Sequence, residues 1–575
     1  MKKCLSILLS VLMLIGLLTA CGSGSAAPSS AGKPDTESSA ASAASSEEAQ
    51  PQPAPENEQT VEVDPERKVT VPGAGQDRYE KIVVGLSSDT TELTPQRPNA
   101  ESRPYFYSEI YEYLFDIVDL DYVPALAKSY EVVDPLHWNV TLRDGIYDSS
   151  GNSIDADDVV YSFDWLVNNG TLTQMDIYGG IEKIDDMTVQ FTWNIEPETV
   201  LALEGPFCRV CIFDKDSFEN GNFATNPVAT GPYVVKEFVP GARIVLEAND
   251  NYWGFASPDF DELTPAHHAN VQTIEYQIKT ENAQHTIGLQ TGGLDFSEAV
   301  PADTLYNFEE GGEYAEGLSV STTLSNLILT LGVNCSADVV TSDPELRIAM
   351  YYALDNETLA AIAGDLEPLK ALGSRYFADY VEDWENLSNY MSEYDLAKSK
   401  EHLDKSSYNG ETIRIYCTTD ETTKNIATMV EVMLEAAGID AEVKASDETL
   451  FSTVQADSAG WEVKLQVKGG GLLSGLYNSL FNAHSRFREF AKQYPDSITT
   501  TFIEDPHLTE LYAAAISVKT YSDESMTELM QYAIDNGYAY FIGAQIKHTV
   551  MTDDIASLYY REGCATMGGS IFYLD

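Results

Sequence analysis

The sequence WNVTLRDGIYDSSGNSIDADDVVYSF, residues 138–163, contains both kinds of regular structure from which the chain is built. Its first residues alternate, with Trp138, Val140 and Leu142 on one side and polar residues between them, which predicts a strand with one packed face. Its last residues predict a helix that begins at Asp155, because aspartate caps helices and the following acidic residues suit the positive end of the helix dipole. This part of the chain is therefore predicted to mix antiparallel strands with a helix.

The neighbouring segments extend this mixed pattern. A buried strand is predicted at residues 81–86, and a helix at residues 108–117. Two hairpins are predicted at residues 181–193 and 233–248, because alternating segments flank an Asp-Asp turn in the first and a Pro-Gly turn in the second. The first half of the folded chain should therefore be rich in antiparallel sheet.

The later part of the chain changes to an alternation of helices and strands. Asp343 and Pro344 predict the capped start of a helix. Residues 412–416 and 439–445 are predicted strands, and between them residues 426–434 place apolar side chains on one helical face. A strand, a helix and a strand in this order predict two parallel strands.

Composition bounds the classes of protein to which the chain can belong. The 575 residues are 43% hydrophobic, which is enough to bury the cores of two or three domains. There are 34 Lys and Arg against 91 Asp and Glu, a formal net charge of −57. Such a charge argues against nucleic acid or an anionic membrane surface as a partner.

The N-terminus has the layout of an export signal. Two lysines precede an apolar run at residues 5–18, which is shorter than the roughly 20 residues of a membrane-spanning helix. Residues 18–21, LTAC, resemble a bacterial lipobox, which implies cleavage before Cys21 and a diacylglyceryl group on its sulfur. The Ala-, Ser-, Pro- and Glu-rich residues 22–76 are expected to be a flexible spacer.

Catalytic and metal-binding motifs are absent from the sequence. We find no HExxH, no GxSxG, no phosphate-binding loop and no cluster with metal-ligand spacing, so we expect no catalytic residue, no metal and no cofactor. His267 and His268 are adjacent, and we expect them to be solvated in a loop. Cys208 and Cys211 have CxxC spacing without a redox context, so we interpret them as structural, with a local disulfide left open.

Several ordered segments resemble the family 5 extracellular solute-binding proteins, the peptide- and nickel-binding components of ABC importers. Residues 142–146 and 155–163 are similar to the family's LRDGV and A-DVVYSF elements, which are the most specific of the set. Residues 249–254 are similar to its NPDYWG element, except that Asp250 replaces the proline. Further similar segments are residues 111–115, 123–127, 226–233, 333–335, 344–347 and 353–355.

The resemblance implies an α/β fold with two lobes of the periplasmic-binding-protein type (type II, family 5) and an extra mixed α+β subdomain in the first lobe. We expect a signal peptide at residues 1–20 and a disordered linker at residues 21–78. The expected first lobe comprises residues 79–114, 228–325 and 540–575, the subdomain residues 115–227, and the second lobe residues 326–539.

The resemblance also places the ligand between the lobes. Peptide-binding members carry an aspartate after a strand of the second lobe, which pairs with the peptide's amine, but residues 461–471 here contain none. If Lys468 points into the cleft, it favours a carboxylate, phosphate or polyhydroxyl group, and if it lies on an exposed loop it does not bear on the ligand. Gly469 and Gly470 allow close approach of the backbone to a ligand, or simply form a flexible loop.

Further candidate ligand contacts come from the segment after residue 86, which corresponds to the family's cleft-lining loop. They are Thr90, Arg97, Arg103 and Tyr105. The arginines suit an anionic group through bidentate hydrogen bonds. Tyr376 and Trp461 offer faces for stacking, with packing in a core as the alternative for each.

We therefore predict an extracellular receptor, lipid-anchored through Cys21, that captures a small solute and delivers it to ABC permease subunits. A peptide is the leading candidate for the solute, and an anionic or sugar-like compound is its competitor. A ligand sensor or adhesion protein with the same fold, and a hydrolase with an unrecognised site, are the alternatives. We expect a monomer on the outer face of the membrane of a Gram-positive bacterium.

Overall fold

The computed structural model describes residues 64–87, 91–95, 103–118, 121–169, 178–194, 196–197, 204–377, 380–455, 457–469, 501–516, 520, 522–561 and 564–574. In this part of the chain, the largest sheet has eleven strands in the order β15-β14-β16-β12-β17-β11-β1-β10-β9-β8, with β13 paired to β17 beside this path. These strands are β1 (Tyr79–Leu86), β8 (Tyr233–Val239), β9 (Arg243–Ala248), β10 (Val271–Ile278), β11 (Phe296–Ser297), β12 (Leu318–Val333), β13 (Leu366–Pro368), β14 (Ile413–Thr418), β15 (Ala441–Ser446), β16 (Val463–Gly469) and β17 (Tyr540–Thr552).

Four hydrophobic cores organise the packing of the described residues, and three of them are larger than the fourth. The first core surrounds β1, β9 and β10 and contains Ile82, Val84, Ile244, Leu246, Ile274 and Phe296. The second core surrounds β14 and β16 and contains Ile328, Leu331, Ile413, Leu434, Leu465 and Phe541. The subdomain core contains Val140, Leu142, Phe163, Val189, Phe191 and Trp193.

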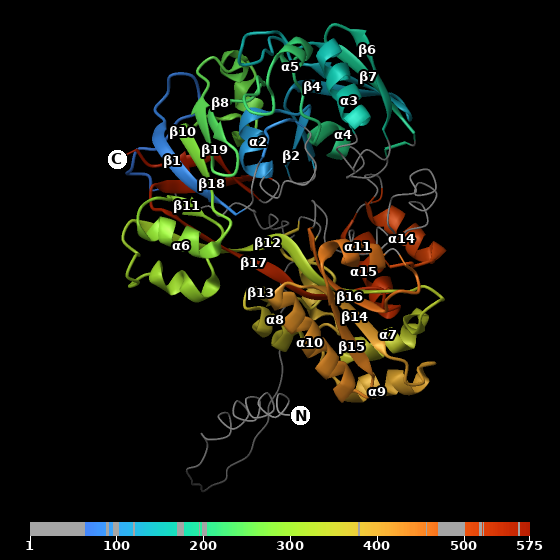
Figure 1. Ribbon diagram of the computed structural model, residues 1–575. Coiled ribbons are helices and arrows are strands. Elements are labelled where there is room, and N and C mark those ends of the chain that lie inside the picture. Colours follow the sequence, from blue (N-terminus) through green and yellow to red (C-terminus); the bar gives the residue numbers. More distant parts are fainter. Residues whose placement is uncertain are drawn as a thin grey trace, which may run out of the picture. The chain divides into compact units, whose positions relative to one another are not determined.

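Strands β12 and β17 are long enough to take part in more than one core. They run antiparallel and side by side, as Figure 1 shows. Leu331 of β12 and Phe541 of β17 lie in the second core, whereas Met551, near the other end of β17, lies in the first. The register shifts between Leu324 and Ile328, because β12 advances four residues there (328 − 324) while β17 advances two (546 − 544). A bulge of this kind bends a strand locally.

Helices alternate with the strands around the second core, which confirms the predicted alternation of helices and strands. The helices are α7 (Pro344–Tyr352), α8 (Asn356–Ala363), α9 (Leu396–Lys405), α10 (Glu421–Ala436), α11 (Glu448–Gln455), α14 (Pro506–Ile516) and α15 (Asp523–Asp535). The Asp343 side chain accepts a hydrogen bond from the Glu345 N–H at the start of α7, which confirms the predicted cap. Strands β14 and β15 are parallel and are connected by α10, which confirms the predicted strand-helix-strand unit.

The subdomain sheet has the order β4-β5-β7-β6, with β4 (Ala127–Asp134), β5 (His137–Leu142), β6 (Tyr178–Asp185) and β7 (Thr188–Trp193). Trp138, Val140 and Leu142 are buried while their neighbours in β5 are half-buried, which confirms the predicted alternation. Helix α3 (Ala156–Asn169) packs on this sheet. Asp155 Oδ1 accepts the Asp157 N–H at 2.8 Å, so the predicted helix start is also confirmed. Two short helices, α4 (Glu204–Cys208) and α5 (Lys215–Asn220), follow.

The helix predicted at residues 108–117 is wrong in its bounds. Helix α2 spans Arg103–Ile110, and Phe115–Val118 form strand β2, which pairs with β3 (Asp121–Pro124). The backbone after residue 110 bonds to distant segments instead of to its own turn. Ile110 O accepts the Gly231 N–H at 2.9 Å, and Glu112 O accepts the Ile212 N–H at 3.0 Å.

The two ends of the described chain lie together. Val69 pairs with Tyr573, and the Thr70 N–H donates to Phe572 O at 2.8 Å. The Arg67 guanidinium lies 3.7 Å from the centroid of the Tyr573 ring. The C-terminal hairpin, β18 (Ile555–Arg561) and β19 (Cys564–Phe572), therefore holds the segment that enters β1. The predicted spacer ends at residue 78, and this boundary remains a prediction. Contacts such as those of Arg67, Val69 and Thr70 come from the last part of that predicted spacer.

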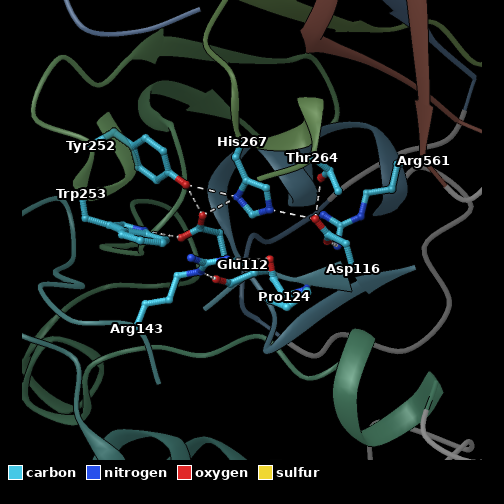
Figure 2. A network of polar contacts seen from close by, with 10 residues as sticks. Glu112, Asp116, Pro124, Arg143, Tyr252, Trp253, Thr264, His267 and Arg561 are labelled. Atoms are coloured by element: carbon cyan, nitrogen blue, oxygen red, sulfur yellow. Dashed lines mark hydrogen bonds and ion pairs between the residues drawn. The ribbon is translucent and has the colours of Figure 1, made fainter. Parts of the chain in front are cut away.

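A buried network of charged side chains links this hairpin to the segment that joins α2 to β2 (Figure 2). His267, in the 3-10 helix η3 (Pro265–His267), is only 2% exposed. Its Nδ1 lies 2.7 Å from Glu112 Oε1 and its Nε2 lies 2.8 Å from Asp116 Oδ2. Arg561 of β18 forms an ion pair with the same Asp116. The expectation that His267 is solvated in a loop is therefore wrong.

The network sets the protonation of its members. Burial would lower the pKa of His267, but the Asp116 and Glu112 carboxylates outweigh it and raise that pKa to about 9. Burial would raise the pKa of Asp116, but Arg561 and His267 hold it well below its usual range. At neutral pH the His267 imidazolium therefore donates from both ring nitrogens to carboxylates. Burial also raises the pKa of Glu109, in α2, to about 8.

His267→Gln should reveal this network through the pH dependence of stability. A group with a raised pKa contributes stability that is fully present below its unfolded value, 6.5, and is lost as the pH rises through the folded value of about 9. The substitution should lower the free energy of unfolding by about 3 kcal/mol at pH 6 and by much less at pH 10. Urea denaturation of the native chain and of the variant at each pH measures this difference. Glu109 is present in both chains, so its own effect on the pH dependence of stability cancels in the comparison.

The matched control for this experiment is His507→Gln, because the His507 side chain is 56% exposed. Its effect should stay within about 0.5 kcal/mol at both pH values. A cost of His267→Gln that does not change with pH would show that His267 is not charged in the folded chain.

Candidate ligand-binding site

Three neighbouring parallel strands end at one edge of the large sheet. β10 and β11 both run parallel to β1 and flank it, so Leu86, Ile278 and Ser297 lie at their carboxyl ends. The Lys279 N–H donates to Leu86 O at 2.8 Å, which fastens two of these ends together. Ligands of α/β sheets bind outside the carboxyl ends of strands, particularly where the strand order reverses. This edge is therefore where a binding site is expected.

His285 connects the residue that follows β10 with the last residue of β11. It lies in α6 (Asn282–Gln290) and is completely buried. Its Nε2 lies 2.7 Å from Lys279 O and its Nδ1 lies 2.8 Å from Ser297 Oγ. A carbonyl oxygen only accepts, so Nε2 carries the proton and Nδ1 accepts from the serine hydroxyl. Burial lowers the pKa of His285 and so favours this neutral form.

Glu298 is the first residue after β11, and its position follows from this support. Glu298 Oε2 lies 3.1 Å from Nζ of Lys547, a residue of β17. The two side chains are 7% and 19% exposed. Burial, and then the Glu298 carboxylate, raise the pKa of the nearby Tyr560 hydroxyl well above its ordinary value, with a smaller contribution from Tyr376. Tyr560 is therefore a neutral hydroxyl beside an ion pair of low exposure.

The end of β16 lies beside the bulge in β12. The backbone of Lys468 is in register with Ile328, and that of Gly469 with Leu327. Ile328 is also the residue at which β12 resumes its pairing with β17. Lys468 thus belongs to a strand rather than to a loop. Contact of Lys468 or Gly469 with a ligand remains a prediction.

The other predicted contacts are placed unevenly. Arg103 and Tyr105 lie in the first turn of α2, and Tyr376 is half-buried against the second core. Trp461 is completely buried, with the Lys464 ammonium 4.7 Å from its ring centroid. Cys21, Thr90, Arg97 and Gly470 lie outside the described residues. Contact of Arg103, Tyr105, Tyr376 or Trp461 with a ligand remains a prediction.

Sequence reasoning missed His285, Glu298, Lys547 and Tyr560. Strand β11 has two residues, too few to show a periodicity, so no pattern pointed to Glu298. Lys547 follows Glu298 by 249 residues, and such a pairing is visible only in the fold. The sequence of the strand ends was the usable signal, because Ser297 and Glu298 are polar residues directly after an apolar one.

The remaining features that bear on function are the two cysteines with CxxC spacing, metal-binding clusters and membrane-spanning helices. Cys208 and Cys211 are both buried thiols, so the structure does not join them as a disulfide. In the described part of the chain, no group of three or more His, Cys, Asp or Glu side chains is arranged to hold a metal ion. Among the described helices, none has the length and hydropathy needed to cross a membrane.

Comparison with known sequences gives consistent matches. A sequence model for "Bacterial extracellular solute-binding proteins, family 5 Middle" matches residues 121–483. The nickel-binding periplasmic protein of Escherichia coli (strain K12) is 24% identical over 390 residues, which are 63% of this chain and 70% of that protein. The oligopeptide-binding protein AppA of Bacillus subtilis (strain 168) is 24% identical over 380 residues, which are 60% of this chain and 65% of AppA.

Solved structures extend the match to nearly the whole described fold. AppA of Bacillus subtilis in complex with a nonapeptide has a TM-score of 0.64 at 18% identity and covers 88% of this chain and 100% of its own. HbpA2 from Haemophilus parasuis has a TM-score of 0.69 at 17% identity and covers 86% of this chain and 100% of its own. At such identities the likeness shows the fold, and the predicted two-lobed α/β fold is confirmed.

Gly85→Ala should disturb the support of this edge. A Cβ at Gly85, in β1, would lie 2.6 Å from His285 Nδ1 and 2.9 Å from Leu294 Cδ1, so the buried imidazole must move. Overpacking of this kind should lower the free energy of unfolding by about 1–3 kcal/mol, measured by urea denaturation.

Gly293→Ala is the matched control, because its Cβ would meet no atom closer than 3.5 Å. It should change stability by less than about 0.5 kcal/mol. Equal stability of the two variants would contradict the packing described for His285.

Proposed function

This chain belongs to the family 5 bacterial extracellular solute-binding proteins, and on that premise we propose that it captures a small solute between two hinged lobes and delivers it to the permease of an ABC importer. The observation that carries the proposal is the course of β12 and β17. Leu331 and Phe541 of these strands lie in the second core, whereas Met551 lies in the first. Two strands that connect two separately packed bodies can bend as a hinge.

The bulge between Leu324 and Ile328 supports this role. It interrupts the ladder between β12 and β17 at the edge of the second core, to which Ile328 belongs and against which Leu324 packs. Bending there changes few hydrogen bonds, whereas bending within a core would disturb close packing. A solute that contacts both bodies would favour the closed arrangement by its differential affinity for that state.

A peptide is the leading candidate for the solute. AppA, which resembles this chain in sequence and fold, was solved with a nonapeptide. An anionic or sugar-like solute is the competitor, supported by the predicted contacts Arg97, Arg103 and Lys468, with Thr90, Tyr105, Tyr376, Trp461, Gly469 and Gly470 as further proposed contacts. The receptor performs no chemistry on the solute in this proposal. A ligand sensor that uses the same fold is the second candidate function.

The anchor and the boundaries of the lobes complete the proposal. Lipid on Cys21 and the spacer after it hold the receptor, as a monomer, at the outer face of the membrane of a Gram-positive bacterium. The first lobe comprises residues 79–114, 228–325 and 540–575, the subdomain residues 115–227 and the second lobe residues 326–539. The three largest hydrophobic cores support this division, since few of their members cross its limits.

Native mass spectrometry tests capture. The chain made without residues 1–21 should carry a bound small molecule, and that molecule at 100 times its dissociation constant should raise the free energy of unfolding by about 2.7 kcal/mol. A product of altered mass in the same incubation would favour the hydrolase alternative. The absence of any bound solute, together with no stabilisation by peptides, sugars or organic acids, would contradict capture.

Metabolic labelling with palmitate tests the anchor. The native chain should incorporate label and remain with the membrane, whereas Cys21→Ser should do neither, because one cysteine sulfur carries the lipid. Cys335→Ser, which removes a cysteine of the second lobe, should be labelled like the native chain. Labelling of Cys21→Ser would place the lipid elsewhere.

A further inference from the structure

His548 lies in a short stretch of β17 that joins two of the packed cores. It is in register with Thr322 of β12. On one side of this pair Leu324 packs against the second core, and on the other side Val320 packs against the fourth core, to which Val550 belongs. The connecting stretch comprises residues 321–323 of β12 and residues 547–549 of β17.

The imidazole of His548 links the connecting stretch to the second body. Its Nδ1 lies 3.2 Å from Thr322 Oγ1, and its Nε2 lies 3.4 Å from Asp365 Oδ1. Asp365 directly precedes β13, and its carbonyl oxygen accepts the Ile546 N–H at 2.8 Å. The backbone therefore fastens β17 to Asp365 as far as Ile546, and the imidazole extends this attachment by two residues (548 − 546).

This placement suits a device that responds to pH. We propose that protonation of His548 restricts the bending of β12 and β17, because the imidazolium holds the connecting stretch to Asp365. Histidine suits the role, since it is the side chain that ordinarily changes its charge between pH 5 and 8. The inference rests on the proposed function, because it names a regulation of the same hinge.

The Asp365 carboxylate lacks a donor that the imidazolium supplies. The Asp365 side chain as a whole is 42% exposed, but its Oδ1 is buried, and no hydrogen bond from the described residues reaches that atom. A buried acceptor without a donor is costly. A neutral imidazole has one N–H, whereas the protonated ring has an N–H on both nitrogens and a positive charge. Nε2 then donates to Asp365 whichever way the Thr322 hydroxyl is turned, so protonation strengthens the attachment.

The other charged groups around the connecting stretch leave this pairing open. Lys547 is the neighbour of His548 in β17, so it points to the opposite face of the strand, where it pairs with Glu298. Arg375 pairs with Glu367 of β13. Both basic residues are therefore held by glutamates, and neither competes with the imidazolium for the Asp365 carboxylate. A cavity beside the connecting stretch of β12 is lined by three further carboxylates, those of Glu309, Glu310 and Glu316.

Double electron–electron resonance on the solute-free chain tests the proposal at pH 5.5 and at pH 8.0. Spin labels at Val239→Cys and Val432→Cys, two exposed positions, report the distance between the first and second bodies. The distance distribution of the native chain should be narrower at pH 5.5 than at pH 8.0. His548→Gln should abolish this difference, because glutamine does not acquire a charge. Asp365→Asn should abolish it as well, because an amide does not attract the imidazolium.

The matched control is His402→Gln, because His402 Nδ1 lies 2.7 Å from Glu345 Oε2 between two helices of the second body. This variant should keep the native difference between the two pH values. A native distribution that does not change with pH overturns the inference, and so does a pH difference that persists in His548→Gln or in Asp365→Asn. Either result leaves solute capture in place, since native mass spectrometry measures capture separately. A chain that captures no solute, but narrows at pH 5.5 only when both residues are present, would still support the restriction by His548.

Discussion

The antiparallel pairing of β12 with β17 is the constraint on which the rest of the structure depends. Among the strands that the structure describes, β12 alone joins β14, β15 and β16 to the rest of the sheet. In the same way, β17 alone joins β1, β8, β9, β10 and β11 to it. Backbone hydrogen bonds in a buried ladder are costly to leave unmade, so the two bodies stay joined. The register shift between Leu324 and Ile328 bends this ladder at the edge of the second core.

A buried cluster joins separate segments within the first body, as β12 and β17 join the two bodies. It consists of Glu112, Asp116 and His267. Glu112 and Asp116 lie beside the start of the subdomain, and Arg561 comes from the C-terminal hairpin. Buried charges contribute little net stability when paired, but removal of one partner is strongly destabilising. The cluster therefore specifies which segments meet, and it makes the correct attachment of the C-terminus a condition for a stable first lobe.

Features that depend on neighbouring residues could be predicted from the sequence, and features that depend on distant ones could not. The alternation at Trp138, Val140 and Leu142 and the cap at Asp343 follow from periods and from local hydrogen bonds. His267 meets Glu112 across 155 residues, so nothing beside it in the sequence indicates burial. A helix is predicted at residues 108–117, yet backbone hydrogen bonds from Ile110 and Glu112 to distant segments end it after Ile110.

The binding site also combines a feature that could be predicted from the sequence with one that only the fold reveals. The resemblance to a family pointed to Lys468, whose backbone lies beside the bulge in β12. The pair of Glu298 with Lys547 became visible only when β11 and β17 were seen side by side. Hinged capture is tested most directly by double electron–electron resonance between spin labels at Val239→Cys in the first lobe and Val432→Cys in the second, two exposed positions. When the co-purified solute is present, the mean distance between the two labels should decrease and the distribution of distances should become narrower. An unchanged distribution with solute bound would contradict closure about β12 and β17.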